Sequence, residues 1–191
     1  MTLRFILYTI AAAIGAALCS CIEDGVTTSA SDQPVCSTDT LDLGLIFTGE
    51  GSPTHSFKIY NRHSKIISLA SVTIRNGQYF RMNVDGFSGK EFSGVEIRPN
   101  DSIFVFVEAT LPSNGGQSLP VEITDHIDIE ANGRTSSVVL RADGQDVDRL
   151  HAHEITADTR MDATLPYQIF DSLVVRSGAT LTLEPGTRLY F

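Results

Sequence analysis

The sequence is poor in the residue types that nucleic-acid-binding proteins depend on. Its 191 residues include no tryptophan, only three cysteines and no cluster of lysine or arginine. With a formal net charge of −9 at pH 7, the chain lacks the basic surface that nucleic acids and anionic headgroups attract. The composition therefore argues against a nucleic-acid partner.

The signature motifs of common enzymes are also missing. The chain contains no Gly-x-Ser-x-Gly elbow, phosphate-binding loop, dinucleotide fingerprint, paired-cysteine motif or calcium loop. His151 and His153 have the spacing that places two imidazoles on one face of a strand, but zinc needs at least one further ligand. We therefore expect no catalytic residue, no metal site and no small-molecule cofactor in this chain.

The first 20 residues have the order of a secretory signal peptide. A short positive start ends at Arg4, and residues 5–18 are almost wholly apolar and carry no charge. This run is shorter than the roughly 20 apolar residues that a membrane-spanning helix needs, and acidic residues follow it. The pattern predicts a signal-peptide helix over residues 1–20, which is removed on export.

The end of this segment resembles a bacterial lipobox, with Leu18 at position −3, Ser20 at −1 and Cys21 at +1. The resemblance implies cleavage between Ser20 and Cys21 and attachment of a lipid to the Cys21 thiol. Two or more acyl chains hold a protein stably on a membrane. The implied location is the bacterial envelope, at the outer membrane, on its periplasmic or its exposed side. Cys19 is a weaker acceptor, because the large Leu18 precedes it.

Loss of Cys19 with the signal and acylation of Cys21 leave Cys36 as the remaining thiol. No intrachain disulfide is then available, even in an oxidising compartment. No lysine, arginine or histidine stands beside Cys36 to lower its pKa. We interpret it as a small buried hydrophobic residue.

Residues 21–36 are rich in serine, threonine and aspartate and are predicted to be a flexible tether. Short alternating strands follow over residues 37–146, and 103–107 is apolar enough to be a central strand. Asn132-Gly133 has the residue types of a two-residue hairpin turn. The number and spacing of the strands predict an immunoglobulin-like β-sandwich.

Parts of this segment resemble known families. Residues 42–49 and 57–62 resemble the opening of Hydin/major-sperm-protein-like immunoglobulin domains, and residues 60–63, 80–86 and 97–107 resemble uncharacterised lipoproteins of the Bacteroidetes group. The resemblance covers most of residues 37–146. It implies a fold and a location, and it implies no activity.

Residues 147–164 are polar and are predicted to be a linker. Within 165–191, the pattern L-x-L-x-P-G-T-x-L-x-F resembles the first coil of a right-handed parallel β-helix, with a corner at Pro185-Gly186. Four residues would point inward: Leu181, Leu183, Leu189 and Phe191. Such coils are stable only when several stack, so the pattern predicts that the chain is a truncated part of a longer protein. The alternative is a hairpin added to the sandwich.

Three tripeptides share the order aspartate, hydroxyl residue, aliphatic residue. They are Asp39-Thr40-Leu41, Asp101-Ser102-Ile103 and Asp171-Ser172-Leu173. This order resembles the O-glycosylation motif of exported Bacteroidetes proteins and would make Thr40, Ser102 and Ser172 acceptors. The alternative is turn chemistry, because aspartate and hydroxyl residues favour turns and all three lie at predicted strand entrances.

The expected fold class is therefore all-β, with a signal-peptide helix, an immunoglobulin-like sandwich and the start of a β-helix. Three functions remain open. The first is a lipid-anchored binding, adhesion or display module that contacts a glycan or a cell-surface protein. The second is the non-catalytic part of a polysaccharide-active enzyme whose site lies on further β-helix coils. The third is a structural component of the envelope.

Overall fold

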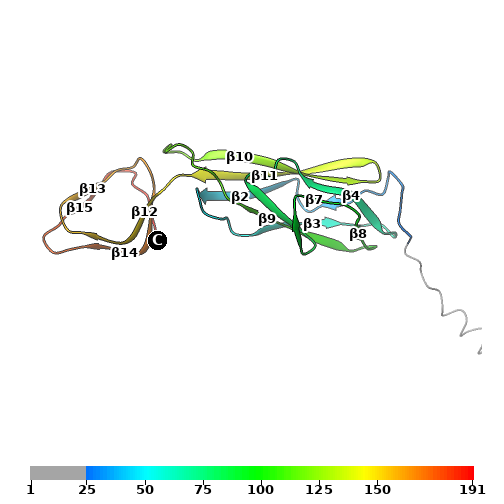
Figure 1. Cartoon of the computed structure of the whole chain (residues 1–191), viewed down its shortest axis with the longest axis horizontal. Helices are drawn as coiled ribbons and strands as arrows, with labels where there is room; N and C mark the ends of the chain where they lie inside the picture. Colours follow the sequence, from blue (N-terminus) through cyan, green and yellow to red (C-terminus); the bar gives the residue numbers. More distant parts are fainter. Residues whose placement is uncertain (1–24) are drawn as a thin grey trace, which may run out of the picture.

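The computed structural model describes residues 25–191, in which every regular element is a β-strand (Figure 1). The expected signal-peptide helix, the cleavage point between Ser20 and Cys21, and the lipid acceptor Cys21 lie outside the described residues. Across 25–191, no helix could cross a membrane. The strands form an immunoglobulin-like sandwich, followed by stacked coils that continue its long axis (Figure 1).

The first sheet of the sandwich has five antiparallel strands in the order β1-β3-β9-β5-β6. These strands are β1 (Val35–Cys36), β3 (His55–Tyr60), β9 (Ser102–Ala109), β5 (Phe80–Val84) and β6 (Phe87–Gly89). The predicted central position of residues 103–107 is confirmed, because β9 pairs with β3 on one side and β5 on the other.

The second sheet has the order β2-β11-β10-β4-β7, and β8 also pairs with β4. These strands are β2 (Thr40–Phe47), β11 (Arg134–Gln145), β10 (Val121–Ala131), β4 (Ile67–Ile74), β7 (Glu91–Phe92) and β8 (Val95–Ile97). Asn132 and Gly133 join β10 to β11 with φ angles of 49° and 73°, which confirms the predicted two-residue turn. Strand β2 pairs with β11 in parallel, so the first long strand and the last strand of the sandwich run in the same direction.

One hydrophobic core lies between the two sheets, because successive side chains of each strand point to opposite faces. Strand β2 departs from this alternation at Gly44, whose φ is 72° and whose N–H donates to Asp42 Oδ1 at 2.8 Å. The pairing with β11 shifts register at the same place. Ile46 is therefore buried, whereas Leu45 is 47% exposed.

The segment before the sandwich is part of the folded body. Val26 forms a parallel bridge with Ile66, and the Asn132 side chain donates to the Asp32 carbonyl at 2.6 Å. Within the tether predicted over 21–36, Val26, Thr27 and Gln33 are thus tied to distant parts of the sandwich, whereas residues 28–31 are exposed.

The C-terminal part winds through short parallel strands. One sheet joins β12 (Asp148–Ile155), β14 (Tyr167–Val175) and β16 (Leu189–Tyr190), and the other joins β13 (Thr159–Met161) and β15 (Leu181–Leu183). Strands β12 and β13 fall inside 147–164, so the linker prediction is wrong there. The polar residues of this segment face water, and Ile155 and Met161 supply its buried side chains.

The parallel pairing does not fit the alternative in which a hairpin extends the sandwich, because these strands pair with one another. Gly186, with φ of 90°, makes the predicted corner between β15 and β16. Leu181 and Leu189 are half-buried, but Leu183 and Phe191 are exposed on the last coil. The handedness of the coils and their continuation as a β-helix stay predictions.

Direct contacts hold the coils against the end of the sandwich. Arg149 Nη2 donates to the Thr48 carbonyl at 2.7 Å, and Arg149 Nε lies 3.4 Å from Glu50 Oε1. The rings of Phe47 and Tyr190 meet edge to face with centroids 5.0 Å apart. These contacts join the end of β2 to the first and last strands of the coils.

Candidate binding face

The two sheets expose outer faces of different chemistry. Outward carboxylates of the six-stranded sheet include those of Asp42, Glu91, Glu96, Glu122, Asp128, Glu130 and Asp143. Arg75 pairs with Asp128, and Arg141 pairs with Glu122 and Asp143. The remaining acids give this face an acidic character. The outer face of the five-stranded sheet instead carries aromatic rings and cationic side chains.

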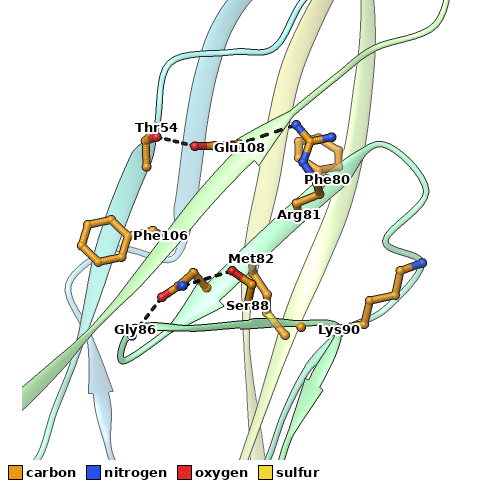
Figure 2. A pocket seen from close by; sticks show the side chains of 11 residues that line it. Thr54, Phe80, Arg81, Met82, Gly86, Ser88, Lys90, Phe106 and Glu108 are labelled. Carbon is orange, nitrogen blue, oxygen red and sulfur yellow. Dashed lines mark hydrogen bonds and ion pairs between the residues drawn. The ribbon is translucent and has the colours of Figure 1, made fainter.

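The outer face of the five-stranded sheet is hollowed into an open trough of about 710 Å³ (Figure 2). Ligand sites for small molecules typically measure about 300–1,000 Å³. Seven side chains that line the trough are used below: Thr54, Arg81, Asn83, Ser88, Lys90, Phe106 and Glu108. They come from strands β5, β6 and β9, from the residue that follows β6 and from the segment before β3, so tertiary folding brings them together.

Aromatic rings stand on this face because β9 is apolar on both sides. Phe104 and Phe106 point outward, with 42% and 38% of their surface exposed. Their rings stack at 5.5 Å and 12°, and the Lys58 ammonium lies 4.4 Å from the Phe104 centroid. Phe104 covers one face of Phe106 without lining the trough, whereas Phe106 lines it. A ring is thus held rigidly at the trough wall.

Hydrogen bonds between the polar lining residues fix their positions (Figure 2). Thr54 Oγ1 donates to Glu108 Oε1 at 2.5 Å, and Asn83 Nδ2 donates to Ser88 Oγ at 3.2 Å. Arg81 Nη2 lies 4.0 Å from Glu108 Oε2. Side chains that hold one another in place lose less conformational entropy on binding. The trough is therefore preorganised.

The hairpin from β5 to β6 forms one wall of the trough. Asp85 and Gly86 make its two-residue turn with φ angles of 49° and 90°, and the Gly86 N–H donates to Asn83 Oδ1 at 2.9 Å. A Cβ on Gly89 would lie 2.9 Å from the Phe92 ring, so glycine permits the close approach. The Asp-Gly dipeptide is a sequence signal for this hairpin that our sequence analysis missed.

The trough contains no catalytic constellation. Glu108 is the one carboxylate among its lining residues, and glycoside hydrolysis ordinarily uses two carboxyl groups. Throughout residues 25–191, no group of three or more His, Cys, Asp or Glu side chains could hold a metal ion.

The predicted glycosylation residues lie on three separate elements. Thr40 begins β2 in the six-stranded sheet and is exposed, and Ser102 begins β9 in the five-stranded sheet and is half-buried. Ser172 is exposed within β14 rather than at a strand entrance, next to Asp171 with φ of 67°. The structure does not bring these hydroxyl groups together.

The two histidines that were expected on one strand face occupy different surroundings. Ala152 between them has φ of 42°, and the pairing of β12 with β14 shifts register there. The exposed His151 ring stacks on Phe170 at 4.5 Å, while His153 is half-buried. This bend interrupts the alternation on which the expectation of a shared face rested.

Two other titratable groups have structural roles. Burial raises the pKa of Cys36 to about 11, which makes its thiolate scarce at neutral pH. Asp146 lies at the end of the sandwich, where burial raises its pKa but hydrogen bonds from Ser113, Thr48, Gly116 and Asn114 outweigh this effect and lower the pKa to about 2. These bonds tie a surface loop to the end of β2.

No protein-family model and no curated protein matches the chain. A protein of unknown function from Porphyromonas gingivalis W83 has 19% identity and a TM-score of 0.44 over 65% of this chain and 50% of that chain. The ASH/PapD-like domain 7 of human CEP192 has 10% identity and a TM-score of 0.40 over 60% of this chain and 85% of that one. The periplasmic chaperone SfaE has 6% identity and a TM-score of 0.34 over 59% and 57%.

The match with the Porphyromonas protein spans half of that protein's length. These identities and TM-scores are too low to support an argument about function. The sandwich assignment rests on the strand order and on the core between the sheets.

Proposed function

We propose that this protein is a lipid-anchored binding module of the bacterial envelope, that it catalyses no reaction, and that it binds a saccharide in the trough of the five-stranded sheet. The lipid anchor on Cys21 is inferred from the lipobox resemblance. The binding role is inferred from the trough.

The observation that carries the proposal is the pairing of an exposed aromatic ring with fixed polar groups. A sugar ring has an apolar C–H face and a rim of hydroxyl groups that both donate and accept hydrogen bonds. Phe106 offers an apolar surface to the C–H face of the sugar. Asn83 and Arg81 offer hydrogen-bond donors to the hydroxyl groups, and Glu108 offers them an acceptor. Both kinds of contact are available within one trough.

The position of the trough also suits a surface role. The described chain begins at one end of the sandwich, and the coils lie at the other end (Figure 1). The trough lies on the side of the sandwich, over β5, β6 and β9. An anchor before residue 25 would therefore leave this side open to solvent and to ligands.

A second role, display of the coils, is favoured by the junction. Arg149 and the ring pair Phe47 and Tyr190 hold the coils against the sandwich. A sandwich joined in this way would act as a spacer that carries the coils away from the anchor.

The test is binding of the purified protein in detergent to an immobilised panel of neutral and acidic glycans. Binding by the wild type should fall at least about tenfold in Phe106→Ala, because central aromatic contacts carry much of the binding energy. Phe191→Ala is the matched control, since that ring is exposed on the last coil, away from the trough. Absence of glycan binding, or unchanged binding in Phe106→Ala, would refute the proposal.

A further inference from the structure

We infer that the saccharide is acidic and that its carboxylate or sulfate group is received by Arg81 and Lys90. This inference rests on the proposed function, because it names the class of saccharide that the same trough selects.

The two cations lie on one flank of the trough. Arg81 belongs to β5 and Lys90 directly follows β6, and both line the trough. Figure 2 shows Phe106 and Lys90 on opposite sides of the view, with the Lys90 ammonium at the outer edge and Arg81 near Glu108. A sugar stacked on Phe106 would extend toward Arg81, and the exposed Lys90 side chain would turn inward to meet it.

The positive charge on this flank is only partly neutralised. Glu108 accepts a hydrogen bond from Thr54 through Oε1, and its Oε2 is 4.0 Å from Arg81 Nη2, at the limit of an ion pair. Among residues 25–191, no carboxylate lies within ion-pair distance of Lys90. Lys58 adds a further cation on the same outer face, above Phe104.

This local charge contrasts with the rest of the chain, whose formal net charge is −9. An anionic ligand is repelled by most of the surface, including the acidic outer face of the six-stranded sheet, and is attracted to this trough. Local charge of the opposite sign steers a ligand to one site and fixes its orientation. Nucleic acid, a larger polyanion, would meet the repulsion along its length.

The experiment compares oligogalacturonate with its methyl ester, and a sulfated glycan with its desulfated form, by isothermal titration calorimetry of the purified protein in detergent. Each pair has the same sugar backbone and differs in charge. We expect the acidic member of at least one pair to bind at least about tenfold more tightly than its neutral partner, with a preference that declines as salt is added.

Lys90→Gln should remove most of that preference, and it should fold normally because Lys90 is exposed. Arg81→Gln should act in the same direction. Arg134→Gln removes an equal charge at the far hairpin of β10 and β11 and should preserve the preference.

The outcomes separate the two proposals. Equal binding of acidic and neutral members, or an unchanged preference in Lys90→Gln, would overturn the inference and leave saccharide binding standing. Failure of the protein to bind any glycan, acidic or neutral, would overturn the proposed function as well.

Discussion

The sandwich and the coils are both made of β-strands, but they bury apolar side chains in different ways. In the sandwich, each sheet covers the core side of the other, and residues such as Ile129 and Val105 are almost completely enclosed. In the coils, strands are short and buried apolar residues are few, with Ile155, Met161 and Ile169 the main ones. The extent of strand pairing therefore does not indicate how stable a region is. The burial of apolar side chains by a covering sheet is the better indicator.

The coils depend more on contacts between successive turns. Backbone bonds repeat at each layer, as from Thr159 N to the Thr180 carbonyl at 2.9 Å. Arg160 Nε lies 2.5 Å from Glu184 Oε1, and Arg176 pairs with Glu154 in the same manner. Since these ion pairs are largely exposed, they contribute little to stability. The coils should thus be the less stable region.

The largest expected effect compares one core residue in each region. Ile129→Ala should destabilise the sandwich by about 2–5 kcal/mol, because it leaves a cavity in an enclosed core. Ile169→Ala should instead lower the stability of the coils and leave the sandwich transition in place. Urea unfolding followed by hydrogen exchange of β9 and β15 amides checks this. Equal loss of protection in both strands for Ile169→Ala would show that the two regions unfold as one unit.

A smaller effect is expected at acid pH, at the end of the sandwich that faces the coils. The pKa of Asp146 is lowered from its ordinary 3.8 to about 2 in the folded protein. Its contribution is therefore complete above the ordinary pKa and is lost as pH falls from about 4 toward 2. A shift of this size would be worth about 2.4 kcal/mol, and screening by water at this partly exposed group reduces it to roughly 1–2 kcal/mol.

Urea unfolding of the wild type and of Asp146→Asn as a function of pH tests this contribution. The variant should be less stable at neutral pH, and the difference should shrink in acid. Asp39→Asn, which removes an exposed carboxylate before β2, is the control and should retain the acid dependence of the wild type. A difference that persists at the lowest pH would contradict the assignment.

The junction should show a weaker effect on stability and a clearer one on shape. Arg149→Ala removes the bond to the Thr48 carbonyl and the contact with Glu50, at a cost of about 1 kcal/mol or less. Small-angle scattering should report a broader distribution of sandwich-to-coil distances. Arg160→Ala, within the coils, should leave that distribution unchanged. An unaltered profile in Arg149→Ala would mean that other contacts fix the junction.

The smallest effect is expected for the ion pair between Arg176 and Glu154. Both side chains are well exposed, so a double-mutant cycle with alanine should give a coupling near the detection limit, which decreases further with salt. A large coupling that resists salt would show that ion pairs stabilise the coils more than backbone pairing does.

Sequence patterns predicted the elements that are determined by residues close together in the chain. The Asn132-Gly133 turn follows from two residues that tolerate positive φ, and the central strand β9 follows from an apolar run. The backbone bridge between Val26 and Ile66 could not be predicted, because the partner is distant in sequence. Strands β12 and β13 escaped prediction because they are polar and paired in parallel with later coils.

The trough could not be predicted from the sequence, for related reasons. Phe104 and Phe106 lie in the run that predicts a core strand, and five apolar residues in succession do not show which of them face water. Thr54 and Lys90 come from separate segments, and only the paired strands place them around one trough. Alternation indicates that a residue points outward, but not what lies beside it.

The parallel pairing of β2 and β11 has a mechanical consequence. Once the contacts of the preceding segment and of β1 have given way, tension between that segment and the coils reaches β2 at its first residue and leaves β11 at its last. Because the two strands point the same way, such tension slides one along the other. Their hydrogen bonds run across the pulling direction, so they are loaded together in shear instead of being unzipped one at a time. This strand arrangement is therefore expected to give the sandwich a high resistance to unfolding when it is pulled along its length.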